Sequence, residues 1–198
     1  KEINLGYTKQ LLQNTEEERK RIAHDLHDSI NYELLSLKKS VHLPQAEEKI
    51  DQIINDVRII SRNLRPALFD KIGLVPNLEQ LIERLQEQHN LLISTEIDYG
   101  SFLKTDEELQ LYRIVQEALT NVVKYAKAYA AKITLHETPE KVRLVVEDNG
   151  IGFDVAKTLT STTSFGLHNI MERSRIIGGT TKIQSSTQGT VIAIEIKK

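Results

Sequence analysis

Through residues 22–41, hydrophobic residues recur every three or four positions, and a charged run precedes them. This spacing predicts an amphipathic helix. At about 100° per residue, the apolar positions share one stripe, made of Ile22, Leu26, Ile30, Leu34, Leu37 and Val41. His27 falls roughly 70° from the centre of the stripe, on its shoulder, and Asp28 lies almost opposite the stripe. We expect this helix to end near Leu43.

A second apolar stripe follows Pro44, a residue suited to the first turn of a helix. It consists of Ile50, Ile53, Val57, Ile60 and Leu64. Two such helices form a hairpin, and a lone hairpin cannot bury both stripes. We therefore expect residues 16–70 to form an antiparallel hairpin that pairs as a homodimer into a four-helix bundle. Residues 1–15 are expected to be a coiled-coil or linker remnant, or a frayed terminus. Pro66 and Gly73 punctuate the connection that follows, where we expect the chain to flex.

From Leu74 onward the pattern becomes mixed. Helices are predicted over 76–89, 105–127 and from 166 to 178. Strands are predicted over 91–99, 130–138, 142–147, 181–186 and 190–197. Thr105 and Glu108 have the spacing of a capping box, with Thr105 at the cap. We expect residues 71–198 to form an α+β sandwich, with helices on one face of a mixed sheet.

Composition narrows the classes of function. The chain has 198 residues, a net charge of −2 and no cysteine. It therefore lacks the basic surplus of a nucleic-acid-binding protein and cannot form a thiolate site. No apolar run of about 18 residues exists, and the chain begins at Lys1 without a signal-peptide pattern. We expect a cytoplasmic fragment of a longer protein, which contacts a membrane, if at all, through a missing N-terminal region.

The pair His27-Asp28 is the first candidate for chemistry. A histidine on the shoulder of a core is held yet reachable, as a nucleophile must be, and Asp28 can orient the imidazole or take its proton. An ordinary boundary histidine with an acidic neighbour has the same pattern.

The residues around this pair decide between the two interpretations. The run Glu-Arg-Lys-Arg-Ile-Ala-His-Asp-Leu-His-Asp resembles the phospho-acceptor box of sensor histidine kinases, in the HisKA_3 subfamily that includes the kinases of nitrate and desaturase control. The resemblance implies that His27 is the phospho-acceptor and Asp28 its general base or orienter. His24 falls at a variable position of the box and is expected to be a surface residue.

A second group of polar residues lies on the predicted helix 105–127, in a wedge opposite its apolar arc. The wedge contains Gln110, Arg113, Glu117, Thr120, Asn121 and Lys124. Glu117 and Asn121 are four residues apart and offer hard oxygen ligands that suit Mg²⁺ with phosphates. A solvated helix face has the same appearance.

Two glycine-containing segments follow. The turn Asp148–Phe153 lets the backbone approach a ligand closely, and its acid can accept a hydrogen bond from an amino group. Gly166 stands at a helix N-terminus, which favours phosphate. Between them, residues 154–164 are rich in Ser and Thr and are expected to be a mobile lid.

The order and spacing of these pieces, ending at Gly189-Thr190, resemble the ATP-binding boxes of the Bergerat (GHKL) superfamily. The resemblance implies that Asn121 is a ligand of Mg²⁺ and that Glu117 helps it in catalysis. Asp148 would read the adenine amino group, Gly150 and Gly152 would shape the pocket, and Gly166 would hold phosphates. The remaining ATP-binding residues that the resemblance implies are Lys124, Tyr125, Phe153, Phe165, Leu167 and Thr190.

Two positions depart from the family pattern. Tyr125 stands where the family usually has histidine. Tyr32 stands where this subfamily has a glutamine associated with dephosphorylation of the partner, and it follows Asn31, where glycine is common. Phosphatase activity and the tuning of the nucleotide site are therefore open.

Together the two resemblances imply an ATP- and Mg²⁺-dependent protein-histidine kinase. It would phosphorylate His27 and pass the phosphoryl group to the receiver domain of a response regulator, with a LuxR-type output domain. One alternative is an ATPase or serine kinase on the same ATP-binding fold. Another is a dimer that binds nucleotide as a signal, with weak or no kinase activity.

Overall fold

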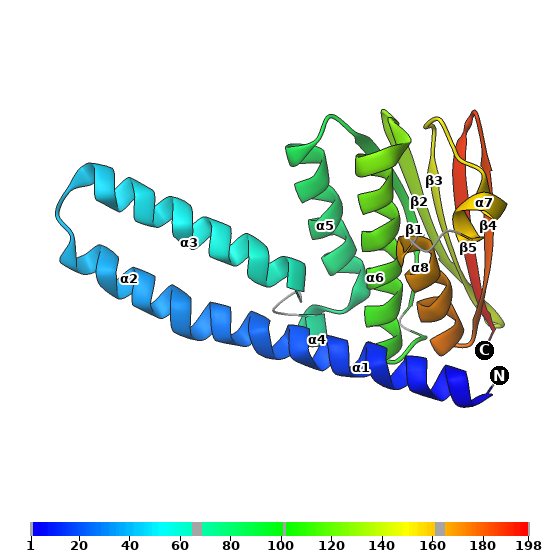
Figure 1. Ribbon diagram of the computed structural model, residues 1–198, viewed down its shortest axis with the longest axis horizontal. Helices are drawn as coiled ribbons and strands as arrows, with labels where there is room; N and C mark the ends of the chain where they lie inside the picture. The colour runs from blue at the N-terminus through cyan, green and yellow to red at the C-terminus, as the bar shows by residue number, and fades with distance from the viewer. Residues whose placement is uncertain (1, 65–68, 101, 161–164, 198) are drawn as a thin grey trace. The chain divides into compact units, whose positions relative to one another are not determined.

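The computed structural model describes residues 2–64, 69–100, 102–160 and 165–197 (Figure 1). The chain divides into two compact units, Lys1–Phe69 and Asp70–Lys198. Within the described ranges, no helix combines the length and the apolar character needed to cross a membrane.

The first unit is an antiparallel helical hairpin (Figure 1). Its first arm runs continuously through α1 (Glu2–Asp25), the π-helical turn η1 (Leu26–Ile30) and α2 (Asn31–Ser40), and its second arm is α3 (Pro44–Leu64). Because α1 begins at Glu2, the frayed alternative for residues 1–15 is wrong from Glu2 onward, and the coiled-coil alternative stays a prediction. The first arm also ends earlier than Leu43, because Val41 is already extended, with φ −97° and ψ 131°. The carbonyl of Leu43 instead accepts the N–H groups of Ala46 and Glu47 in the first turn of α3.

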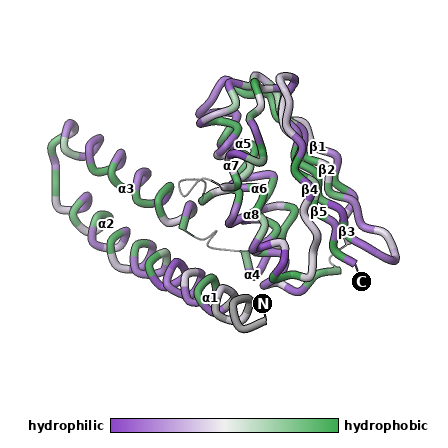
Figure 2. The backbone as a smooth tube through the Cα atoms, turned by 45° about the vertical axis from the view of Figure 1, so that its right-hand side comes forward, coloured by the Kyte–Doolittle hydropathy of each residue, from purple (hydrophilic) through white to green (hydrophobic). Residues whose placement is uncertain are grey.

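Contacts between the two arms bury only part of their apolar surface. Ala23, Ile50 and Ile54 are buried, and the Ser61 hydroxyl donates to the Ala23 carbonyl oxygen at 3.0 Å. Figure 2 shows hydrophobic positions recurring along both arms. Several of them are more than one-third exposed, namely Ile30, Leu35, Leu37, Leu43, Ile53 and Ile60. As the sequence predicts, a single hairpin leaves an apolar face uncovered.

The second unit is a mixed five-stranded sheet with helices against one face (Figure 1). In chain order its elements are α4 (Phe69–Ile72), α5 (Leu74–Gln88), β1 (Leu92–Asp98), α6 (Thr105–Asn121), the π-helical turn η2 (Val122–Ala126), β2 (Ala130–Glu137), β3 (Lys141–Asp148), α7 (Val155–Thr160), α8 (Phe165–Ile176), β4 (Gly179–Ser186) and β5 (Gly189–Lys197). The strand order is β1-β2-β3-β5-β4. The β1–β2 pair is parallel and the other pairs are antiparallel.

The core of this unit lies between the sheet and helices α5, α6 and α8. Alternate strand residues such as Ile133, Leu135, Leu144 and Ile194 are fully buried, as a half-buried sheet requires. The helices contribute Leu78, Leu111, Ile114, Leu119 and Ile170 to the same core. The predicted α+β sandwich is therefore present.

Two helix starts differ from expectation. Helix α5 begins at Leu74, two residues before the expected Pro76, because proline is tolerated anywhere in the first turn. Lys104, not Thr105, is the N-cap of α6, and its N–H donates to Glu107 Oε2 at 2.9 Å. Glu108 is instead buried and accepts a hydrogen bond from the Tyr99 hydroxyl at 2.9 Å. The capping interaction is therefore one residue earlier than predicted.

The segment expected as a lid without periodic structure contains a short helix. Asp154 accepts the N–H of Lys157 through its Oδ1 and the N–H of Thr158 through its carbonyl, which starts α7. Residues 161–164 of this segment and Pro66 of the expected flexible connection lie outside the described residues.

We predict that Leu78→Ala lowers the free energy of unfolding of the second unit by about 2–5 kcal/mol, because it removes a fully buried side chain beneath the sheet. Urea unfolding monitored by circular dichroism measures the change. Leu92→Ala removes the same atoms from a residue that is 70% exposed and should change the stability little. Equal effects of the two variants would contradict this placement of the core.

Candidate functional site

His27 and Asp28 lie in the π-helical turn η1, which interrupts the first arm of the hairpin. The Asn31 N–H donates to the Leu26 carbonyl, five residues back, as in a π-helix. No residue of Leu26–Ile30 is buried, and the His27 side chain is 58% exposed. The expectation that core packing holds His27 is therefore wrong within this chain.

A hydrogen bond takes the place of packing. His27 Nδ1 lies 2.8 Å from Asp28 Oδ1. The pKa of Asp28 is lowered, chiefly by this hydrogen bond and further by the charge of the nearby imidazoles. An ionised carboxylate only accepts hydrogen bonds, so Nδ1 must carry the proton. The neutral imidazole then has an unprotonated Nε2, the nitrogen that faces away from Asp28 and can act as a nucleophile.

Tyr32 and the adjacent Asn31, at the start of α2, differ in burial. Tyr32 is 74% exposed, so its hydroxyl can reach solvent. Asn31 is buried, and among the described residues its Oδ1 has no hydrogen-bond partner. A buried carbonyl oxygen of this kind destabilises the fold, because it loses its bonds to water and gains none in return.

In the second unit, α6 and α8 bring three of the predicted site residues together. A Cβ added to Gly166, in the first turn of α8, would overlap Glu117 Oε1 and lie 3.2 Å from Asn121 Nδ2. Glu117 and Asn121 are half-buried on adjacent turns of α6. A carboxylate and an amide therefore lie beside the N-terminal turn of α8, an arrangement suited to phosphate and a hard cation.

The N-terminal part of the predicted polar wedge, Gln110 and Arg113, lies outside this site. Arg113 is buried, and its Nη1 donates to Gln116 Oε1 at 2.8 Å. Gln110 is also buried and accepts from Arg173 Nη1 of α8 at 2.6 Å. Both residues of the N-terminal part of the wedge are therefore buried, Gln110 against Arg173 of α8, and only the C-terminal part stays available for a ligand.

The turn Asp148–Phe153 packs against the end of η2. The Ile151 N–H donates to the Ala126 carbonyl oxygen at 2.9 Å, and a Cβ on Gly150 would overlap that same oxygen. The Gly150 N–H donates to Asp148 Oδ1 at 2.8 Å, which folds the carboxylate back over the turn. Lys124 and Tyr125, on η2 itself, are exposed.

The role of Asn149 was not predicted from the sequence. Its Oδ1 accepts the backbone N–H groups of Tyr129, at 3.2 Å, and Ala130, at 3.0 Å. This side chain therefore ties the glycine turn to the first residue of β2. An asparagine beside an aspartate and a glycine signals a turn in sequence, but it does not identify the strand that the turn will contact.

Ser185 holds the C-terminal end of the turn, a role that was also not predicted from the sequence. Ser185 Oγ accepts the Phe153 N–H at 2.9 Å and lies 2.9 Å from Thr190 Oγ1. Gly152 has φ +62°, and a Cβ there would overlap the Ser186 carbonyl oxygen. Thr190 is buried opposite Asp148 in the β3–β5 register. The predicted residue Thr190 thus helps to position the turn through Ser185.

The two remaining predicted residues lie in the first turn of α8. Phe165 is 72% exposed, whereas the Leu167 side chain is buried in the core. Leu167 can therefore contribute to a ligand only through its backbone N–H.

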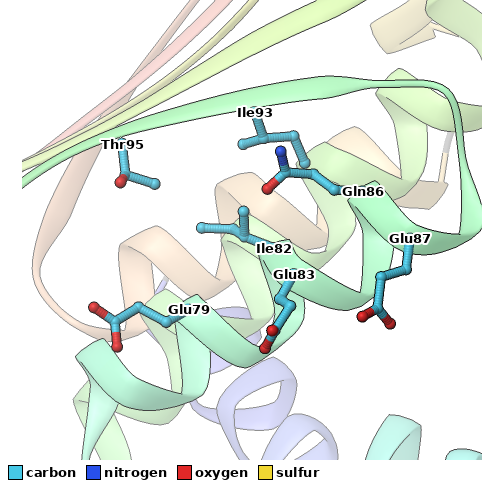
Figure 3. Close-up of a pocket in the computed structure, with 7 residues that line it drawn as sticks. All are labelled: Glu79, Ile82, Glu83, Gln86, Glu87, Ile93 and Thr95. Atoms are coloured by element: carbon cyan, nitrogen blue, oxygen red, sulfur yellow. The ribbon is translucent and has the colours of Figure 1, made fainter.

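A groove of ≈ 580 Å³ lies in the same unit, between α5 and β1. Figure 3 shows the side chains that line it. It is lined by Glu79, Ile82, Glu83, Gln86, Glu87, Ile93 and Thr95, none of which is a predicted site residue. Three glutamates along its wall would repel a polyphosphate, so this groove does not suit a nucleotide. Among the residues that the structure describes, no group of three or more His, Cys, Asp or Glu side chains is arranged to bind a metal.

Comparison with known proteins identifies relatives of both units. Residues 106–198 match the family described as histidine kinase-, DNA gyrase B- and HSP90-like ATPase. The sensor histidine kinase ComP of Bacillus subtilis is 34% identical over 92% of this chain, and the oxygen sensor histidine kinase NreB of Staphylococcus carnosus is 28% identical over 96%. The chain spans 26% of the length of the first relative and 60% of the second.

Solved structures show a similar fold. The histidine kinase domain of a blue-light activated histidine kinase from Erythrobacter litoralis superposes with a TM-score of 0.56 at 16% identity, over 84% of this chain and 93% of that one. The histidine kinase AdeS of Acinetobacter baumannii gives a TM-score of 0.54 at 16% identity, over 88% of this chain and 97% of that one.

We predict that Gly166→Ala weakens the binding of MgATP roughly tenfold or more, because the added Cβ displaces Glu117 from the start of α8. Titration with a fluorescent ATP analogue measures the affinity, and circular dichroism checks the fold. Gly6→Ala is the matched control, since a Cβ there meets nothing within 4 Å. Unchanged affinity in Gly166→Ala would exclude this glycine from the nucleotide site.

Proposed function

We propose that this chain is the kinase core of a two-component sensor histidine kinase, which phosphorylates its own His27 from ATP and passes the phosphoryl group to an aspartate of a response regulator. The observation that carries the proposal is the bond between His27 Nδ1 and Asp28 Oδ1. In the neutral imidazole this bond places the proton on Nδ1 and leaves Nε2 unprotonated, on a side chain that is 58% exposed to solvent.

In the proposed step, His27 Nε2 attacks the γ-phosphorus of ATP in line with the leaving group. The Nε2–P bond forms, and the bond from phosphorus to the β,γ-bridging oxygen breaks, so that ADP leaves with the electron pair. The imidazole becomes positively charged as this happens. Asp28 stabilises that charge through the proton on Nδ1, and it is the group that can accept this proton.

The second unit would hold the nucleotide. Asp148 would accept a hydrogen bond from the adenine amino group, and the backbone N–H groups at Gly166 would bind phosphates. Glu117 and Asn121 fit Mg²⁺, since two oxygen-bearing side chains are enough when phosphates and water complete the shell. When bound, Mg²⁺ would neutralise part of the negative charge of the phosphates. Catalysis would then consist mainly of positioning and electrostatic stabilisation.

The proposal also gives consequences for the two tyrosines that depart from the family pattern. Tyr125, exposed on η2, would replace the usual histidine beside Lys124. Tyr32 would leave the bundle without the glutamine that positions water for dephosphorylation. We therefore expect autokinase activity to be retained and dephosphorylation of the regulator to be weak.

The uncovered apolar face of the hairpin supports a homodimer. Residues such as Leu37 and Ile60 are about half exposed in a single chain. A second copy would bury them in a four-helix bundle, which removes apolar area from water. The partner in phosphoryl transfer would be a receiver domain, with a LuxR-type output domain attached to it.

We predict that His27→Gln abolishes labelling by γ-labelled ATP, because glutamine has no nucleophilic ring nitrogen, and leaves ATP binding unchanged. In the parent chain the label should survive base and be lost in acid, as phosphohistidine behaves. Label that survives acid and is lost in base would favour the serine kinase instead. Labelling that persists in His27→Gln would move the acceptor, with His24 as the first candidate. His42→Gln, at an exposed histidine, is the control.

We predict that Ile60→Asp converts the dimer to a monomer, because it places a charge within the apolar face of α3. Sedimentation equilibrium measures the mass. Asn55→Asp adds the same charge at an exposed position roughly 140° around the helix and should leave the dimer intact. A monomeric parent chain, or an Ile60→Asp dimer of undiminished affinity, would exclude this face as the interface.

A further inference from the structure

Asp28 contacts two imidazoles, one through each carboxylate oxygen. Oδ1 lies 2.8 Å from His27 Nδ1, and Oδ2 lies 2.8 Å from His24 Nδ1, one helical turn earlier. Because the ionised carboxylate only accepts hydrogen bonds, both Nδ1 atoms must be donors. The position that the motif leaves variable is therefore occupied by a direct partner of the proposed base.

Asp28 has little else to hold it. The side chain is 57% exposed, and no residue of Leu26–Ile30 is buried against the rest of the chain. An exposed aspartate bound at one oxygen can rotate about its side-chain bonds and exchange that bond for water. A second bond at the other oxygen restricts this rotation and keeps Oδ1 directed at His27.

Arg21, the basic residue one helical turn before His24, has other partners. Arg21 donates from Nε to Glu18 at 3.0 Å and from Nη1 to Asp25 at 3.2 Å. These contacts draw the Arg21 guanidinium toward Glu18 and Asp25. His24 therefore donates to Asp28 from the preceding helical turn, and its Nδ1–H can do so whether the ring is neutral or charged.

We propose that His24 is a positioning residue for phosphoryl transfer: it holds the carboxylate of Asp28 so that Asp28 keeps the His27 proton on Nδ1 and leaves Nε2 free to attack. This inference rests on the proposed autokinase function. His24 does not touch the phosphoryl group, and its effect passes through Asp28.

The kinetic test compares His24→Ala, His24→Asn and His42→Ala in the full chain. His24→Ala should lower the maximal rate of His27 phosphorylation about three- to tenfold, the effect of one hydrogen bond to a charged group, with KM for ATP unchanged. His24→Asn places an amide donor near the position of Nδ1 and should recover at least half of this loss. His42→Ala removes an exposed histidine from the connection between α2 and α3 and should change neither quantity. An unchanged maximal rate in His24→Ala would overturn the proposal, as would a rise in KM that accounts for the whole loss.

Nitrogen-15 NMR of the imidazole rings provides a readout that does not depend on activity. Neutral His27 should carry its proton on Nδ1 in the parent chain and in His24→Asn. In His24→Ala it should shift toward a mixture that includes the Nε2–H tautomer. The same His27 tautomer in all three proteins would overturn the role of His24. Absence of phosphorylation in the parent chain would instead contradict the proposed function, and the NMR comparison would then decide the positioning role alone.

Discussion

Burial of one sheet face under α5, α6 and α8 is the constraint on which the second unit depends. Leu119 of α6 and Ile170 of α8 are fully buried beneath the same sheet, so the two helices must lie side by side. That packing brings the start of α8 against Glu117 and Asn121. The polar pair becomes a candidate site only because an apolar core places a helix N-terminus next to it.

Close backbone approach completes the arrangement. The turn after β3 packs against η2 at Gly150 and against the β4–β5 hairpin at Gly152, where a Cβ would meet carbonyl oxygens. Hydrogen bonds from Asn149 and Ser185 hold the two ends of the turn. In the hairpin unit the site residue is held differently: His27 is exposed, and a hydrogen bond to Asp28 orients it in place of packing. Both units place predicted functional residues in π-helical turns, which are frequent at functional sites.

Sequence patterns predicted which elements exist better than they predicted what those elements contact. The apolar stripes identified both arms of the hairpin, and alternation identified the strands. The capping residue of α6 was misplaced by one, because Glu107 and Glu108 are both acidic and only the fold directs Glu108 toward Tyr99. The helical wheel of α6 gives the direction of Gln110 and Arg113, but it does not show that both are buried or that Gln110 meets Arg173 of α8.

By itself, the sequence determined the local structure and the chemical groups. The hydrophobic periodicity, Pro44 and the glycines act on the backbone within a few residues, so the helices, strands and turns that they specify can be predicted locally. The motifs around His27 and Asn121 are also short segments, which can be found in the sequence alone. Only the tertiary structure decided which distant groups meet, such as Gly166 with Glu117 or Ser185 with Phe153. These contacts depend on how the helices and strands pack around a common core, which a local sequence pattern does not specify. His24 belongs to both cases: it is near Asp28 in the sequence, yet only the structure places the imidazoles of His24 and His27 on the same carboxylate.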